Sequence, residues 1–113
     1  MSLIEERTQE INALIKEMTL EEKVSLMLHE SMAVERLGIH EYNWWNEALH
    51  GVARAGVATV FPQTIGLAAT FDTDLAKKQY DAISDEARAK YNEAQKIGDR
   101  RQFRGLTFWT PNI

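Results

Sequence analysis

Helical spacing of hydrophobic residues dominates the first thirty positions of the chain. One predicted helical face carries apolar residues at positions i, i+3, i+4 and i+7, namely Ile11, Leu14, Ile15 and Met18. Thr19 and Glu22 then have the spacing of a capping box, which predicts the start of a second helix. The apolar stripe of that helix comprises Leu20, Val24, Met27 and Leu28. We therefore expect two amphipathic helices that pack against a larger body.

The pattern changes at residue 30. Residues 30–41 have the character of a connection, and the apolar residues 66–70 predict a short buried strand. Asp72 can cap the following helix, and Gly98 can end it. The buried face of this helix is expected to carry Ala76, Tyr80, Ile83, Ala87, Tyr91 and Ala94. Residues 106–109 are alternating and aromatic, which predicts another strand. Because a helix separates these strands, the expected fold class is α/β with a parallel sheet.

Composition narrows the function classes. The chain has 113 residues, of which 44% are hydrophobic and 27% charged, as in a globular domain. Its net charge is -4, from 13 basic and 17 acidic residues without a basic stripe, so we expect no nucleic-acid partner. The absence of cysteine excludes a zinc–thiolate site and a cysteine nucleophile. No apolar run reaches the length of a membrane span, so we expect no membrane partner. No signal peptide is visible, so we expect a cytoplasmic protein, or a periplasmic or secreted one if a leader was removed.

The candidate chemistry lies in residues 42–56, where two tryptophans stand side by side. An extended backbone would place Tyr42, Trp44 and Asn46 on one face and Asn43, Trp45 and Glu47 on the other. The second face combines an amide, a flat aromatic ring and a carboxylate, which together suit a sugar ligand. The alternative is that both tryptophans belong to the core and Glu47 lies on the surface.

Other chemistries have weaker support in the sequence. Glu47 and His50 have the Glu-x-x-His spacing of di-iron bundles, but a second such motif is missing, so we expect no metal and no cofactor. His29, His40 and His50 lack ligand spacing among themselves. The serines lack a nucleophile-elbow context, and no glycine-rich phosphate loop is present. The three arginines of residues 99–105 could bind an anion, although a solvated connector is the expected outcome.

Four phrases in order resemble the N-terminal part of glycoside hydrolase family 3, closest to its β-xylosidase-like branch. They are YNWWNEALHGVARAG, ATVFPQTIGLAATFD, ISDEARAKYNEA and GLTFWTPNI, and the resemblance covers residues 19–113. It implies a (β/α)₈ TIM-type barrel, of which this chain holds the N-terminal helices, the first strands and one helix. Residues 1–113 would then be a truncated barrel domain, with residues 1–30 as helical lead-in and 31–113 as the first β/α units.

The resemblance also implies an activity, namely hydrolysis of terminal β-linked sugars with retention of configuration. Glu47 matches a carboxylate that binds sugar hydroxyls, Trp45 matches a wall of the same subsite, and Asn43 and His50 would support the pocket. The expected partners are a β-linked oligosaccharide or glycoside and the remainder of the same enzyme. Segments for the catalytic nucleophile and the acid/base are missing, so no catalytic residue is assigned and the isolated chain is expected to be inactive. The alternative is a free-standing carbohydrate-binding or interaction module without catalysis.

Overall fold

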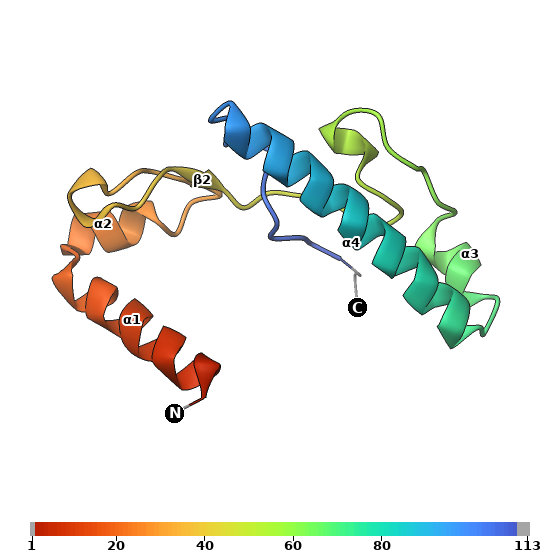
Figure 1. Ribbon diagram of the computed structural model, residues 1–113, viewed down its shortest axis with the longest axis horizontal. Helices are drawn as coiled ribbons and strands as arrows, with labels where there is room; N and C mark the ends of the chain where they lie inside the picture. Colours follow the sequence, from red (N-terminus) through yellow and green to blue (C-terminus); the bar gives the residue numbers. More distant parts are fainter. Residues whose placement is uncertain (1, 111–113) are drawn as a thin grey trace.

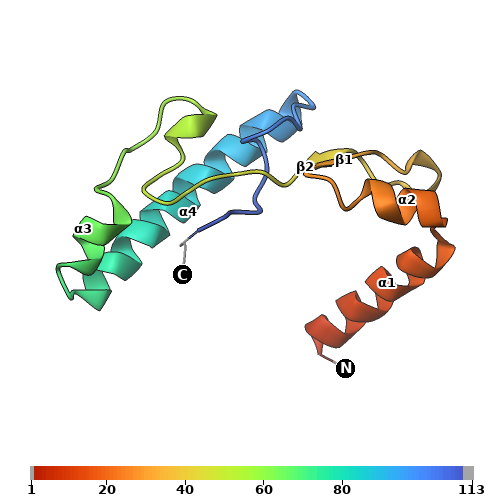
Figure 2. The ribbon, with the colours of Figure 1, turned by 180° about the vertical axis from the view of Figure 1, so that it is seen from behind.

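The computed structural model describes residues 2–110 and shows a mixed helical fold with one small sheet (Figure 1). In chain order the elements are α1 (Leu3–Glu17), α2 (Leu20–Ser25), β1 (Glu30–Ser31), the 3-10 turn η1 (Glu35–Leu37), β2 (Tyr42–Asn43), the 3-10 turn η2 (Ala53–Ala55), α3 (Thr64–Ala68) and α4 (Thr73–Lys96). Helices α1 and α2 lie with the strands at one end, and α3 and α4 lie at the other, as Figure 2 shows from behind. The segment 42–47 joins the two ends.

The second N-terminal helix begins where its predicted capping residue lies. The Thr19 hydroxyl accepts from the Glu22 backbone N–H, and the Glu22 carboxylate accepts from the Thr19 N–H, so the predicted capping box is confirmed. Arg36 also binds Glu22, and the Arg36 guanidinium together with the Thr19 N–H lowers the pKa of Glu22 to about 2. None of the residues within α1 is buried, so this helix does not pack against a larger body within residues 2–110, although such packing was expected for it.

Helix α2 is shorter than its apolar stripe predicts. It ends at Ser25, so Met27 and Leu28 lie beyond it and are exposed. The Ser31 hydroxyl hydrogen-bonds to the carbonyl groups of Leu26 and Leu28, which satisfies acceptors that a longer helix would have used. The prediction of a continuous stripe to Leu28 is therefore wrong.

The strand predicted at residues 66–70 is also wrong, because this segment forms most of the short helix α3. Leucine and alanine have high helix propensity, and the β-branched residues that favour a strand are sparse here. Only Leu67 of this helix is buried, so no sheet environment overrides the local preference.

The long helix α4 follows its prediction closely. The Asp72 carboxylate accepts from the Leu75 N–H at 2.8 Å, and Gly98 takes a left-handed φ of 69° just after the helix. Ile83, Ala87 and Ala94 are buried as expected, whereas Ala76, Tyr80 and Tyr91 are half-buried. Ile83 and Ala87 pack with Ala48 and Val52 into the core, around which lie Ala58, Phe61, Tyr80, Leu106 and Phe108. The core therefore sits directly beneath the segment that carries Glu47.

The sheet is smaller than predicted. Strands β1 and β2 pair antiparallel, with Glu30 opposite Asn43. Residues 106–109 form one parallel bridge, Asn46 with Phe108, rather than a regular strand. The parallel direction expected across α4 is thus present at a single pair.

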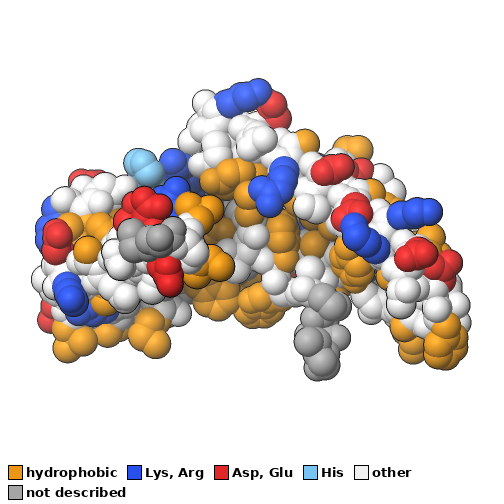
Figure 3. Space-filling view, turned by 60° about the horizontal axis from the view of Figure 1, so that its bottom comes forward, with side chains coloured by type: hydrophobic (Ala, Val, Ile, Leu, Met, Phe, Trp, Pro, Cys, Tyr) orange, Lys and Arg blue, Asp and Glu red, His pale blue; other side chains and the backbone are white. Residues whose placement is uncertain are grey.

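Hydrophobic side chains remain on the surface in the described part of the chain. Figure 3 shows hydrophobic side chains exposed on the face that it draws. The exposed hydrophobic residues include Leu3, Ile4, Ile11, Leu20, Met27, Val57, Ile65, Phe71 and Ile97. Exposed apolar patches can mark surfaces that other proteins cover. Within residues 2–110, no helix is long and apolar enough to cross a lipid bilayer.

Candidate functional site

The three tryptophans of the chain form one cluster. The Trp45 ring stacks on the Trp109 ring with centroids 4.8 Å apart and an interplanar angle of 28°. Trp44 lies 5.6 Å from Trp109, and the His29 ring meets both Trp44 and Trp45 edge-on. Trp109 is 48% exposed, so the cluster presents a flat aromatic surface to solvent.

The residues predicted to share one face are joined by hydrogen bonds. The Trp45 indole N–H donates to Glu47 Oε1 at 3.1 Å, and the Trp45 backbone N–H donates to Asn43 Oδ1 at 2.9 Å. The arrangement therefore places the amide, the indole and the carboxylate together, although the strand itself ends at Asn43. Asn43 itself is buried, and it holds the Trp45 backbone rather than the indole ring.

Glu47 is held from its other side by a basic residue. Arg54, on η2, donates from Nε to Glu47 Oε2 at 3.3 Å, and its guanidinium lies 5.6 Å from the Phe103 ring centroid. The Glu47 side chain is 32% exposed. A carboxylate offers about four acceptor positions, and two are used here, so Glu47 retains acceptors for hydroxyl groups of a ligand.

Trp44 departs from the strict separation of faces. Its indole N–H donates to the Leu28 carbonyl at 2.7 Å, and its ring is half-buried, yet it also contacts Trp109. The regular strand stops at Asn43, so the side chains beyond it no longer alternate to opposite faces. The prediction that Trp44 and Trp45 point apart is therefore wrong at the level of the rings.

His50 is not brought to the cluster. Its backbone carbonyl accepts from the Phe61 N–H at 2.8 Å, and among residues 2–110 no hydrogen bond joins its imidazole to Trp45 or Glu47. Its assignment to pocket support is untested. In the same described region, no group of three or more His, Asp or Glu side chains could hold a metal ion.

The hollows of the surface do not coincide with the cluster. A cleft of about 730 Å³ lies between β1, β2 and the end of α4, lined in part by Glu30, Asn43 and Arg100. Neither Trp45 nor Glu47 lines it. The cavity that does touch Glu47 holds only about 10 Å³. The aromatic surface is therefore open to solvent and is not an enclosed pocket.

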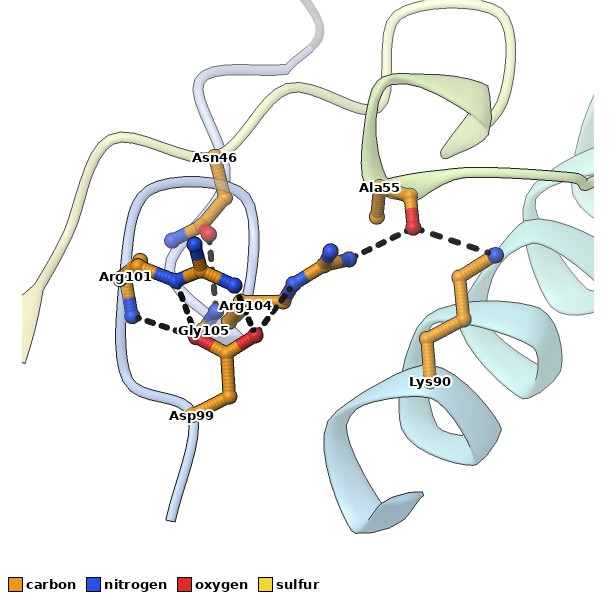
Figure 4. Close-up of polar contacts among 7 residues, drawn as sticks. All are labelled: Asn46, Ala55, Lys90, Asp99, Arg101, Arg104 and Gly105. Carbon is orange, nitrogen blue, oxygen red and sulfur yellow. Dashed lines mark hydrogen bonds and ion pairs between the residues drawn. The ribbon is translucent and has the colours of Figure 1, made fainter. Parts of the chain in front are cut away.

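The loop 99–105 is tied down by its own charges, as Figure 4 shows. Asp99 accepts two hydrogen bonds from the Arg101 side chain and one from Arg104 Nε at 3.1 Å. The Arg101 guanidinium, with a smaller effect from Arg104, holds the pKa of Asp99 well below its usual range. Arg104 also donates to the Ala55 carbonyl at 2.6 Å, which Lys90 approaches as well. The expected solvated connector is thus an ion-paired loop, and Arg101 and Arg104 are not free for an anion.

Three functional candidates were missed in the sequence. Trp109 was assigned only to a strand, Arg54 was given no partner, and Asn46 was placed on the opposite face without a role. Each acts through contacts with residues far along the chain or across a turn, for which the local pattern carries no signal. The alternating aromatic pattern of residues 106–109 is the one sequence feature that indicates an exposed ring at Trp109.

Comparison with known proteins identifies relatives of one kind. The chain is 47% identical over 102 residues to a xylan 1,4-beta-xylosidase of Xylanibacter ruminicola, which covers 88% of this chain and 12% of that protein. It is 45% identical over 117 residues to a probable exo-1,4-beta-xylosidase of Aspergillus fumigatus, covering 94% of this chain and 14% of the relative. Beta-D-xylosidase 3 of Arabidopsis thaliana is 41% identical over 113 residues, or 91% of this chain and 14% of that protein.

These homologues are xylosidases, and the chain spans about an eighth of their length. No protein-family model matches the chain. No solved structure matches it either.

Proposed function

We propose that this chain is part of a retaining, exo-acting β-xylosidase of glycoside hydrolase family 3, in which it supplies one wall of a sugar-binding subsite. The observation that carries the proposal is the Trp45–Glu47 pair, joined at 3.1 Å beside the exposed ring of Trp109. The similarity of the chain to named xylosidases, at 41% to 47% identity over most of its length, supports a β-xylosidase activity of the whole enzyme.

The chemistry of the pair suits a pyranose ring. A sugar presents a face of C–H groups, which packs against a flat aromatic surface, and a rim of hydroxyl groups, which donate to a carboxylate. Trp45 and Trp109 offer the aromatic surface, and Glu47 offers the acceptors. Arg54 balances the Glu47 charge and fixes the carboxylate in one orientation.

Glu47 binds the substrate in this proposal and does not perform the chemistry. A retaining glycosidase uses two carboxyl groups about 5 to 5.5 Å apart. The polar partners of the Glu47 carboxylate among residues 2–110 are Trp45 and Arg54, and neither is a carboxyl group. We propose that the nucleophile and the acid/base, as well as the rest of a β/α barrel, come from other parts of the enzyme. The chain alone would then have no glycosidase activity.

A chimera tests this proposal directly. The matched segment of the Xylanibacter ruminicola xylosidase is replaced by residues 19–110 of this chain, and hydrolysis of an aryl β-xyloside is measured. We expect an active chimera in which Glu47→Gln raises KM or lowers kcat by about tenfold to a hundredfold, since hydrogen bonds to a charged group are worth about 1.5 to 3 kcal/mol and 1.4 kcal/mol is about tenfold. Glu35→Gln, at an exposed glutamate of η1, is the matched control and should change neither constant.

Two results would count against the proposal. Full activity in the Glu47→Gln chimera would remove Glu47 from the subsite. An inactive chimera, combined with binding of xylo-oligosaccharide by the chain alone, would favour the free-standing binding module instead.

A further inference from the structure

Asn46 is the largest fully buried side chain in the described part of the chain, with 1% of its surface exposed. It lies between Trp45 and Glu47, the two residues of the proposed subsite. A buried amide is costly unless both its oxygen and its nitrogen have partners. The partners of Asn46 therefore show what the protein uses this residue for.

All of the hydrogen-bonding groups on the Asn46 side chain are used. Its Oδ1 accepts from the Gly105 N–H at 2.8 Å (Figure 4), and its Nδ2 donates to the Thr107 carbonyl at 2.9 Å and to the Asn43 carbonyl at 3.3 Å. Its backbone carbonyl accepts from the Trp109 N–H at 3.1 Å. One residue thus binds the 105–109 segment at three successive points.

These bonds determine which side chain of the 105–109 segment reaches the subsite. Asn46 pairs with Phe108, and a slip of one residue in such a pairing turns every side chain to the opposite face. Trp109 would then leave the ring of Trp45. Close approach also requires Gly105, because a Cβ there would lie 2.5 Å from the Tyr42 hydroxyl and 2.8 Å from Asn46 Nδ2.

We propose that Asn46 is a positioning residue of the sugar subsite: its amide fixes the register of the 105–109 segment and so holds Trp109 against Trp45. The link to a sugar subsite rests on the proposed function. The register of the 105–109 segment can be tested without any sugar. Asn46 does not touch the substrate in this account. It acts through Trp109.

The first experiment uses near-UV circular dichroism of the full chain. All three tryptophans lie in the cluster, so the tryptophan bands report on the Trp45–Trp109 stack. Asn46→Asp keeps the shape and the acceptor for Gly105 but lacks the donor to Thr107 when ionised. We expect it to lose at least half of the tryptophan signal at about pH 8, with the far-UV helix signal retained.

Acid should restore this variant. A protonated carboxyl group has one O–H donor, which can replace the lost bond to Thr107, and burial raises the pKa of the introduced carboxyl above that of a free aspartate. The near-UV signal of Asn46→Asp should therefore recover as the pH falls from about 8 to 5, while the unsubstituted chain changes little. A wild-type signal at pH 8, or a loss without recovery at pH 5, would overturn the proposal.

Two further variants separate positioning from general destabilisation. Ile83→Val removes a methylene from the core of α4, away from the cluster, and should keep the tryptophan signal below its melting transition. Gly105→Ala introduces the clash described above, and should lose the signal with its helices intact. The Gly105→Ala result decides the matter if Asn46→Asp does not fold at pH 8, since a retained signal would overturn the proposal.

The xylosidase chimera links the register to sugar binding. There, Asn46→Asp should raise KM about tenfold at pH 7 and leave kcat within about twofold. If Glu47→Gln left KM and kcat of the chimera unchanged while Asn46→Asp lost the tryptophan signal, the proposed function would be rejected and the positioning role would stand. If Glu47→Gln impaired the chimera but Asn46→Asp left KM unchanged, the proposed function would stand and the positioning role of Asn46 would be rejected.

Discussion

Removing the charge of Asp99 should loosen the loop 99–105, in which the Phe103 N–H donates to the Trp45 carbonyl. Asp99→Asn keeps the shape of the side chain but replaces a carboxylate that accepts from Arg101 and Arg104. The Asp99 side chain is only 11% exposed, whereas Arg101 is 82% exposed. Arg101 makes the larger contribution to the lowered pKa of Asp99, but its side chain is exposed and solvent screens this pair, so we expect most of the loss of stability to come from the partly buried contact with Arg104.

The expected cost is about 1 to 2 kcal/mol, the range for a hydrogen bond to a charged group with partial screening. Arg104 also holds the Ala55 carbonyl, so the loss should extend to η2 and to Arg54. The measurement is urea unfolding at low protein concentration, followed by tryptophan fluorescence, at pH 7 and at about pH 3. Arg101→Gln is the control and should cost clearly less.

The sign of the pH dependence follows from the lowered pKa of Asp99. A group with a depressed pKa in the folded state stabilises the protein above its unfolded pKa, about 3.9 for Asp, and this contribution declines as the pH falls further below that value. The unsubstituted chain and Asp99→Asn should therefore differ at pH 7 and draw closer below about pH 4. Equal stability at pH 7, or a difference that is as large at pH 3, would refute the account of the loop.

Two other predictions follow from the surface and from the tryptophans. The isolated chain should self-associate, because apolar side chains such as Ile4 and Ile11 remain exposed. The double substitution Ile4→Lys and Ile11→Lys should shift the chain toward monomer in size-exclusion chromatography with light scattering. A clean monomer of the unsubstituted chain at high concentration would contradict this prediction. Trp44→Ala should lower the free energy of unfolding by less than the about 3 to 5 kcal/mol of a core tryptophan, since Trp44 is half-buried, and an unchanged urea midpoint would show that its ring contributes nothing.

Features that depend on neighbouring residues could be predicted from the sequence. Thr19 with Glu22, and Asp72 before α4, mark helix starts because a cap needs only the three residues that follow it. The grouping of Trp45 with Glu47 was predictable for the same reason. The strand predicted at residues 66–70 is wrong because a short apolar run cannot be assigned to a strand or a helix by periodicity alone.

Features that depend on distant contacts could not be predicted. Nothing in the residues around Asn46 indicates that its amide meets Gly105, and nothing near Arg54 indicates that it holds Glu47 across a turn. The ion pairs of Asp99 were hidden because a run of arginines has the same composition whether it is solvated or paired. The family resemblance assigned Trp45 and Glu47 but gave no role to Asn46 or Trp109.

The distance along the chain between Asn46 and Gly105 also affects how the protein is made. The two residues are 59 positions apart, and α4 lies between them. At a synthesis rate of about 5 to 20 residues per second, the tryptophan pair leaves the ribosome roughly 3 to 12 seconds before its partner segment. During that interval the two indole rings lack the 105–109 segment that contacts them in the folded chain, so we expect this stretch of the nascent chain to be an early binding site for chaperones.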